Sequence, residues 1–251
     1  MRRGSHRGAC QRLLVLFVGI GLAIEASASA QTESDFEIWT ATFFTGQLFS
    51  DTPTPIFWFD AHARRSEVGT VAILRPGVGV ALTPWASLWL GYAWTPTWVD
   101  ATGGLLDEHR IWEQLTLDFR RVPGLLLQSR TRLEQRFRPD SSGTSHRFRE
   151  FVRVNYRPTQ RLPIGIAFFD EVFLGIRGAG WARQGFDQNR AFLGLAIFAL
   201  EALFRVEVGY LNVFLSRDPN RMAHALSLNF FVSYGGRSRS AQETQSTLDR
   251  N

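Results

Sequence analysis

Charged residues occupy every second position between Arg130 and Arg138, in the stretch "QSRTRLEQRFR" (128–138). Uncharged residues, among them Leu133 and Phe137, fill the positions between them. A helix would distribute such charges around its axis, whereas a strand places them all on one face. Because guanidinium forks match the oxygens of phosphate and carboxylate groups, this face has the chemistry to bind anions or to pair with acids.

The same alternation of charged and apolar residues continues along the chain. In 146–157 it is interrupted only at Glu150 and Phe151. We predict that the charged sides of these segments together form a charge network or an anion-binding surface. Its predicted members are Arg110, Arg120, Arg130, Arg132, Glu134, Arg136, Arg147, Arg149, Arg153, Glu171, Arg190, Arg205 and Glu207.

The first thirty residues have the pattern of a secretory signal peptide. Arginines precede an apolar run from Leu13 to Ile24, which is followed by an A-x-A-like cleavage site ending at Ala30. Removal of residues 1–30 would leave 24 basic and 22 acidic residues and no cysteine, because Cys10 leaves with the signal. This small net charge does not indicate nucleic-acid binding, and a mature chain without cysteine has no disulfide or thiol chemistry.

Segments with a period of two follow the signal, and most are about ten to fourteen residues long. Ordinary strands average about five or six residues, whereas a tilted strand that crosses a membrane needs about nine to eleven. No apolar stretch of about 18 residues, as a membrane-spanning helix needs, follows the signal. The expected strands are 36–48, 54–65, 68–82, 86–95, 108–120, 125–138, 146–157, 164–176, 189–199, 203–214 and 222–234.

These strands predict an all-β fold: an antiparallel up-and-down transmembrane β-barrel over residues 31–234, followed by a disordered polar tail at 235–251. Eleven segments are delineated, but single-chain bacterial barrels have even numbers of strands. We therefore expect about ten to twelve strands and prefer twelve; either one segment is not a strand, or 68–82, interrupted by "RPG", is two. Long connections such as 96–107 alternate with short turns, as is typical of these barrels.

Several short motifs follow one another in a fixed order along the chain. They are "LRPGVGV" (74–80), "LWLGYAW" (88–94), "EHRIWEQ" (108–114), "RTRLEQRF" (130–137), "GFDQNR" (185–190) and "EVGYLN" (207–212). In this order they resemble the bacterial outer-membrane proteins grouped as domain of unknown function 2490, over roughly residues 36–234. The resemblance implies an outer-membrane β-barrel without an assigned activity, and it supplies no catalytic residues.

Three roles are compatible with such a barrel. The first is a small-lumen channel, transporter or scaffold whose arginine-rich lumen favours anions. The alternative for the same charges is a structural network in which arginine and glutamate side chains pair and fill the lumen. The second is a rim-active enzyme on lipid or lipopolysaccharide, for which His146 and the nearby Ser141, Ser142 and Ser145 supply residue types. The third is a soluble periplasmic β-barrel that binds an apolar ligand.

The sequence assigns no catalytic residue, metal site or cofactor, because zinc spacings, Walker loops and dinucleotide fingerprints are absent from it. The signal peptide and the barrel pattern together predict a location in the outer membrane. The expected partners are outer-membrane lipid, the barrel-assembly machinery and small anions, with no nucleic acid.

Overall fold

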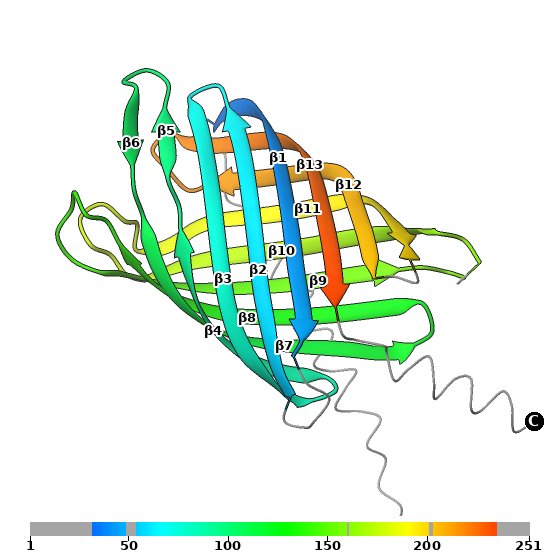
Figure 1. Cartoon of the computed structure of the whole chain (residues 1–251). Coiled ribbons are helices and arrows are strands. Elements are labelled where there is room, and N and C mark those ends of the chain that lie inside the picture. Colours follow the sequence, from blue (N-terminus) through cyan, green and yellow to red (C-terminus); the bar gives the residue numbers. More distant parts are fainter. Residues whose placement is uncertain (1–31, 49–53, 160, 201–202, 235–251) are drawn as a thin grey trace, which may run out of the picture.

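The chain is all β in the computed structural model, which describes residues 32–48, 54–159, 161–200 and 203–234 (Figure 1). The predicted signal peptide (1–30) and the predicted polar tail (235–251) lie outside these residues. Among the residues described, no helix has the length and hydropathy needed to cross a membrane.

Thirteen strands form a single sheet. Eleven of them match the segments delineated from the sequence to within a few residues, because alternation over ten or more positions is a strong strand signal. The strands are β1 (Thr32–Gln47), β2 (Thr54–Ser66), β3 (Gly69–Thr83), β4 (Ala86–Trp94), β5 (Thr97–Val99), β6 (Gly104–Leu106), β7 (His109–Val122), β8 (Leu125–Phe137), β9 (Ser145–Tyr156), β10 (Ile164–Arg177), β11 (Gly185–Ala199), β12 (Phe204–Leu215) and β13 (Asn220–Tyr234).

Eleven of these strands close into a barrel, and β5 and β6 lie outside it. Consecutive strands alternate in direction, so the first and last of eleven point the same way. β1 and β13 therefore close the barrel as a parallel pair, from Thr32 opposite Asn220 to Gly46 opposite Tyr234 (Figure 1). The predicted range of ten to twelve strands is confirmed, whereas the preference for twelve is wrong, because β3 continues unbroken through the "RPG" sequence.

The hairpin of β5 and β6 projects beyond one end of the barrel (Figure 1). It continues the β4–β7 ladder in the same register, since the backbones of Thr95 and Glu108 exchange hydrogen bonds of 2.8 and 3.3 Å between the two strand pairs. Pro96 has no N–H to donate, so it separates β4 from β5. The segment predicted as a long connection at 96–107 is in part this extension.

Apolar side chains cover the outer surface of the barrel, and charged side chains lie inside it. Leu193 on β11 is 59% exposed and Ile166 on β10 is 53% exposed, whereas Arg132 and Glu134 on β8 are almost completely buried. This is the inverse of a water-soluble barrel and agrees with the predicted faces.

The two residues that break the alternation in β9 nevertheless keep its register. Phe151 faces the interior and is 4% exposed, where the guanidinium of Arg130 lies 4.2 Å from its ring centre. Glu150 faces outward and accepts hydrogen bonds from Ser129 (2.8 Å) and Thr131 (2.6 Å) on β8. Neighbouring hydroxyl groups thus satisfy an acid on an otherwise apolar surface.

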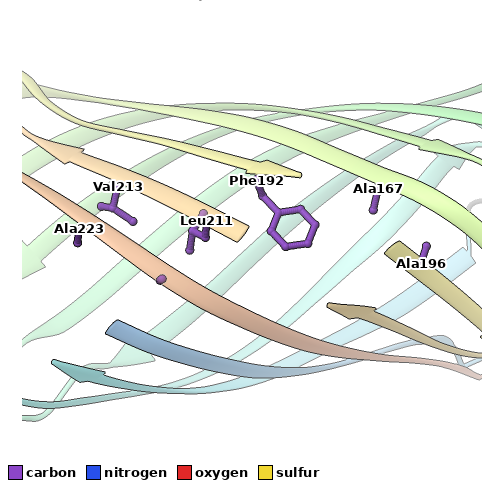
Figure 2. Packing of buried hydrophobic residues seen from close by; sticks show 7 residues of the cluster. Ala167, Phe192, Ala196, Leu211, Val213 and Ala223 are labelled. Atoms are coloured by element: carbon purple, nitrogen blue, oxygen red, sulfur yellow. The ribbon is translucent and has the colours of Figure 1, made fainter. Parts of the chain in front are cut away.

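Small and aromatic residues fill the interior where charges are absent. On β10 to β13, Phe192 packs among Ala167, Ala196, Leu211 and other buried residues (Figure 2). This apolar cluster lies on the β10 to β13 side of the lumen, and the largest group of buried charged residues lies on the adjoining strands β7 to β9.

A second apolar cluster centres on Trp112, which is fully buried on β7. Its ring lies against Gly77 and Gly91, and a Cβ at Gly77 would come within 2.6 Å of it. The glycines in "GVGV" thus make room for an aromatic ring inside the barrel, as expected for glycine at a crowded strand position.

Candidate functional site

Two cavities occupy the lumen, one toward each end of the barrel. The loop end carries the β5–β6 hairpin and the 178–184 connection, and the turn end carries short turns such as 123–124. The loop-end cavity has a volume of about 570 Å³, and the turn-end cavity about 240 Å³.

Arginine dominates the wall of the loop-end cavity. Two acids, Glu108 and Asp187, line it together with ten arginines. Trp181 and Thr95 also line it, and the indole Nε1 of Trp181 and the hydroxyl of Thr95 are buried without a hydrogen-bond partner among the residues described. The arginines are Arg64, Arg75, Arg110, Arg136, Arg138, Arg147, Arg149, Arg183, Arg190 and Arg217.

The turn-end cavity is smaller and more aromatic. It is lined by Asp118, Arg120 and Arg205 near the turn end, together with Trp58 and Phe231. Four arginines line both cavities and so lie where the two meet. These shared arginines are Arg64, Arg75, Arg149 and Arg190.

Glu134 and Glu171 hold the centre of the charge network. Glu134 accepts hydrogen bonds from Arg147 (2.6 Å) and Arg149 (2.5 Å), and Arg147 lies directly opposite it on β9. Glu171 on β10 accepts from Arg149 (2.7 Å) and from Arg130 (2.7 Å). Each carboxylate is shared by two guanidinium groups, so the network retains positive charge.

Arg132, at the middle of the alternating charges on β8, has a different environment. Its guanidinium donates to the side-chain oxygen of Gln114 (2.8 and 2.5 Å) and lies 4.3 Å from the ring centre of Trp112. The nearest contact to Glu134 is 4.0 Å. A neutral amide and an aromatic face thus hold a fully buried guanidinium.

Glu108 gathers the arginines of the loop end. It accepts from Arg110 (2.6 Å) and Arg136 (2.7 and 2.8 Å), and Arg138 lies at 3.4 Å. Burial by itself would raise the pKa of the Glu108 carboxyl, but the neighbouring Arg110 and Arg136 outweigh it and hold that pKa below its ordinary value. Glu108 therefore carries a negative charge and partly offsets three positive ones.

Glu207 on β12 forms a third group toward the turn end. Asn155 donates to it at 2.8 Å, and the guanidinium groups of Arg205 and Arg153 lie 3.1 and 3.5 Å from its carboxylate. Arg120 is exposed at the turn end of β7, where it lines the smaller cavity. Every candidate residue from the sequence therefore faces the lumen or lines one of its cavities.

Strand β2 contributes residues that were not among the candidates. Asp60 is completely buried and lies opposite Arg75 on β3, which donates to it at 2.8 and 2.6 Å. Trp58 and His62 also hydrogen-bond to the Asp60 carboxylate. The signal is present in the sequence, because Trp58, Asp60, His62 and Arg64 alternate with apolar residues as the charges on β8 do.

The residue types for a rim enzyme do not converge. Ser145 and His146 are neighbours in β9, so their side chains point to opposite faces. Ser145 is buried inside, and its hydroxyl has no hydrogen-bond partner among the residues described. In the same part of the chain, no group of three or more His, Cys, Asp or Glu residues is arranged to hold a metal ion.

Comparison with known proteins gives a family without a function. The model of a family described as protein of unknown function (DUF2490) matches residues 36–223. The chain belongs to this family. An uncharacterized protein of Methylorubrum extorquens is 30% identical over 229 residues, which cover 85% of this chain and 94% of that relative.

Among solved structures, LpxR from Salmonella typhimurium is similar with a TM-score of 0.44 and 9% sequence identity. The similarity covers 72% of this chain and 83% of that chain. The family match over residues 36–223 confirms the resemblance to the DUF2490 family found in the sequence motifs.

Proposed function

We propose that this DUF2490 protein is an outer-membrane β-barrel that admits small anions into its lumen, as a small-lumen channel or transporter. Outer-membrane lipid would surround the barrel, and the barrel-assembly machinery would insert it. The observation that carries the proposal is the loop-end cavity, in which ten arginines face two lining acids. Such an excess of fixed positive charge in a low-dielectric wall concentrates anions and repels cations.

The carboxylates behind the wall do not neutralise this excess. Asp60, Glu134 and Glu171 contact cavity arginines, but Glu134 and Glu171 are each shared by two or more guanidinium groups. A purely structural network would match acids and bases more closely, since a buried unpaired charge is costly. The remaining positive charge therefore favours a lumen that takes up anions over a sealed scaffold.

The outer surface supports the membrane location. Exposed leucine, isoleucine, valine and phenylalanine residues lie on β1 to β4, β7, β8, β10 and β11, and exposed Tyr156, Tyr210 and Leu226 continue the surface onto β9, β12 and β13. A soluble protein rarely exposes an apolar surface of this extent, whereas a transmembrane barrel needs one. The soluble, apolar-ligand alternative requires the opposite distribution of side chains.

Substitution of Leu193 by arginine tests the membrane location. Leu193 is exposed near the middle of β11, so a charge there would lie in hydrocarbon and lower the free energy of unfolding by about 2–4 kcal/mol. The measurement is urea unfolding of protein inserted in lipid vesicles, followed by the faster gel migration of the folded barrel. Leu193→Ile is the control, and a soluble protein would tolerate both changes equally.

Loss of anion preference in a double variant tests the proposed transport. Arg138 and Arg183 line the loop-end cavity, where Arg138 lies 3.4 Å from Glu108 and 4.5 Å from the ring centre of Trp181, and Arg183 donates to the Phe186 carbonyl. A unit charge roughly 8 Å from an ion in water contributes about 0.5 kcal/mol, and screening by about 0.1 M salt roughly halves this. Each arginine attracts an anion and repels a cation by the same amount, so Arg138→Ala with Arg183→Ala should lower the anion-to-cation permeability ratio roughly fivefold.

Reversal potentials across planar bilayers under a potassium chloride gradient measure this ratio. Arg121→Ala with Arg177→Ala is the matched control, because these two arginines are exposed and line neither cavity. A wild-type barrel without conductance, or an unchanged ratio in the lumen variant, would contradict anion transport.

A further inference from the structure

The four shared arginines differ in how well their charge is compensated. Arg75 is engaged by Asp60 through contacts of 2.8 and 2.6 Å, and Arg149 is engaged by both Glu134 and Glu171. Arg64 and Arg190 have no carboxylate at comparable distance among the residues described. These two guanidinium groups are thus the least compensated charges at the junction of the cavities.

Arg64 and Arg190 also converge on one aromatic ring. The guanidinium carbons lie 4.0 and 4.9 Å from the ring centre of Trp39 on β1. The Nε of Arg64 is buried without a hydrogen-bond partner in the part of the chain described. Arg190 lies 3.8 Å from Glu171, and its Nε and Nη2 can donate to the Gln188 side-chain oxygen, which satisfies donors but not charge.

Two positive charges on one ring repel each other, and burial makes that repulsion more costly than it would be in water. A bound anion between them would remove this cost and use the free Nε of Arg64. Guanidinium forks favour an anion with several oxygens over a spherical halide, because each fork can donate two parallel hydrogen bonds.

We propose that Arg64 and Arg190 bind the phosphate of a phosphate monoester whose hydroxylated, sugar-like body lies in the loop-end cavity. This inference rests on the proposed uptake of anions by the same lumen. The cavity volume of about 570 Å³ exceeds what a phosphate alone would fill and lies in the usual size range of small-molecule sites. The unpartnered Trp181 Nε1 and Thr95 hydroxyl lie in its wall and offer hydrogen bonds to hydroxyl groups.

Isothermal titration calorimetry in detergent tests the site with glucose 6-phosphate, inorganic phosphate and glucose as probes. Glucose 6-phosphate should bind saturably, inorganic phosphate more weakly, and glucose not measurably. Arg64→Ala and Arg190→Ala should each weaken glucose 6-phosphate binding at least tenfold. Arg64→Lys, which keeps the charge but loses the fork, should also weaken it and serves if the alanine variant does not fold.

Arg177→Ala is the matched control, since it removes an exposed arginine that lines neither cavity, and it should bind as the wild type does. Equal affinity for phosphate and glucose 6-phosphate would overturn the sugar-like body, and undiminished binding by the Arg64 and Arg190 variants would overturn the site. Chloride selectivity measured in bilayers separates the two proposals: an anion-selective barrel that binds neither phosphate refutes only the ligand, whereas a barrel without selectivity refutes the transport function.

Discussion

Replacement of Glu134 by alanine is expected to lower the free energy of unfolding of the barrel by about 3–5 kcal/mol. Glu134 is 1% exposed and accepts hydrogen bonds from Arg147 and Arg149, with Arg132 at 4.0 Å. Its removal would leave these guanidinium groups buried together, and their mutual repulsion would have no opposing charge. The remaining carboxylates already serve other arginines, so none can replace it.

Two variants separate charge from hydrogen bonding at this position. Glu134→Gln keeps an acceptor oxygen but not the charge, and it should show an intermediate loss. Glu67→Ala removes an exposed acid from the connection between β2 and β3 and should change stability by no more than about 0.5 kcal/mol. The fraction of folded protein on unboiled gels across a urea series gives the free energy of unfolding of all three variants. If Glu134→Ala lowered this free energy by less than about 1 kcal/mol relative to the wild type, the proposed role of Glu134 in the charge network would be contradicted.

Truncation of Trp112 is expected to have a second effect of similar size, about 3–5 kcal/mol. The indole is fully buried against the glycines of β3 and β4, and its Nε1 donates to the carbonyl of Tyr92 at 3.1 Å. Trp112→Ala would leave a cavity there and remove the aromatic face under Arg132. Unfolding in lipid vesicles, again followed by gel migration, measures the loss.

The glycine beneath the ring gives this prediction a specific control. Gly77→Ala would push a Cβ to within 2.6 Å of the indole and should cost about 1–3 kcal/mol in the wild-type background. Without the ring the nearest neighbour of the new methyl group would be the Leu90 carbonyl oxygen at 3.3 Å, so the same change should cost clearly less in Trp112→Ala. Gly180→Ala, where a Cβ meets nothing within 4 Å, is the reference, and additive effects of Gly77→Ala and Trp112→Ala would contradict the contact.

Much of the barrel could be predicted from the sequence because residues that alternate between charged and apolar along a strand lie on its two opposite faces. The charged positions of β8 were assigned to the interior, and Arg130, Arg132 and Glu134 are all buried there. That prediction did not identify which carboxylate pairs with each arginine. Arg130 is held by Glu171, whereas Arg136 is held by Glu108, which alternation alone does not single out.

Features that depend on how distant strands align could not be predicted in this way. Asp60 and Arg75 meet because β2 and β3 pair in one particular register, and Arg64 and Arg190 meet across a barrel that only closure creates. The preference for twelve strands was wrong for a related reason. An even count follows from antiparallel closure, and this chain closes with a parallel pair instead.

The parallel pairing of β1 and β13 also determines at which end of the barrel the first strand begins and the last strand ends. β1 begins at the loop end and β13 finishes at the turn end, so the first and last barrel residues emerge from opposite ends of the molecule (Figure 1). In a barrel with an even number of antiparallel strands, the first strand would begin and the last strand would end at the same end of the barrel. If this barrel spans a bilayer, Thr32 and Tyr234 therefore lie on opposite sides of the membrane.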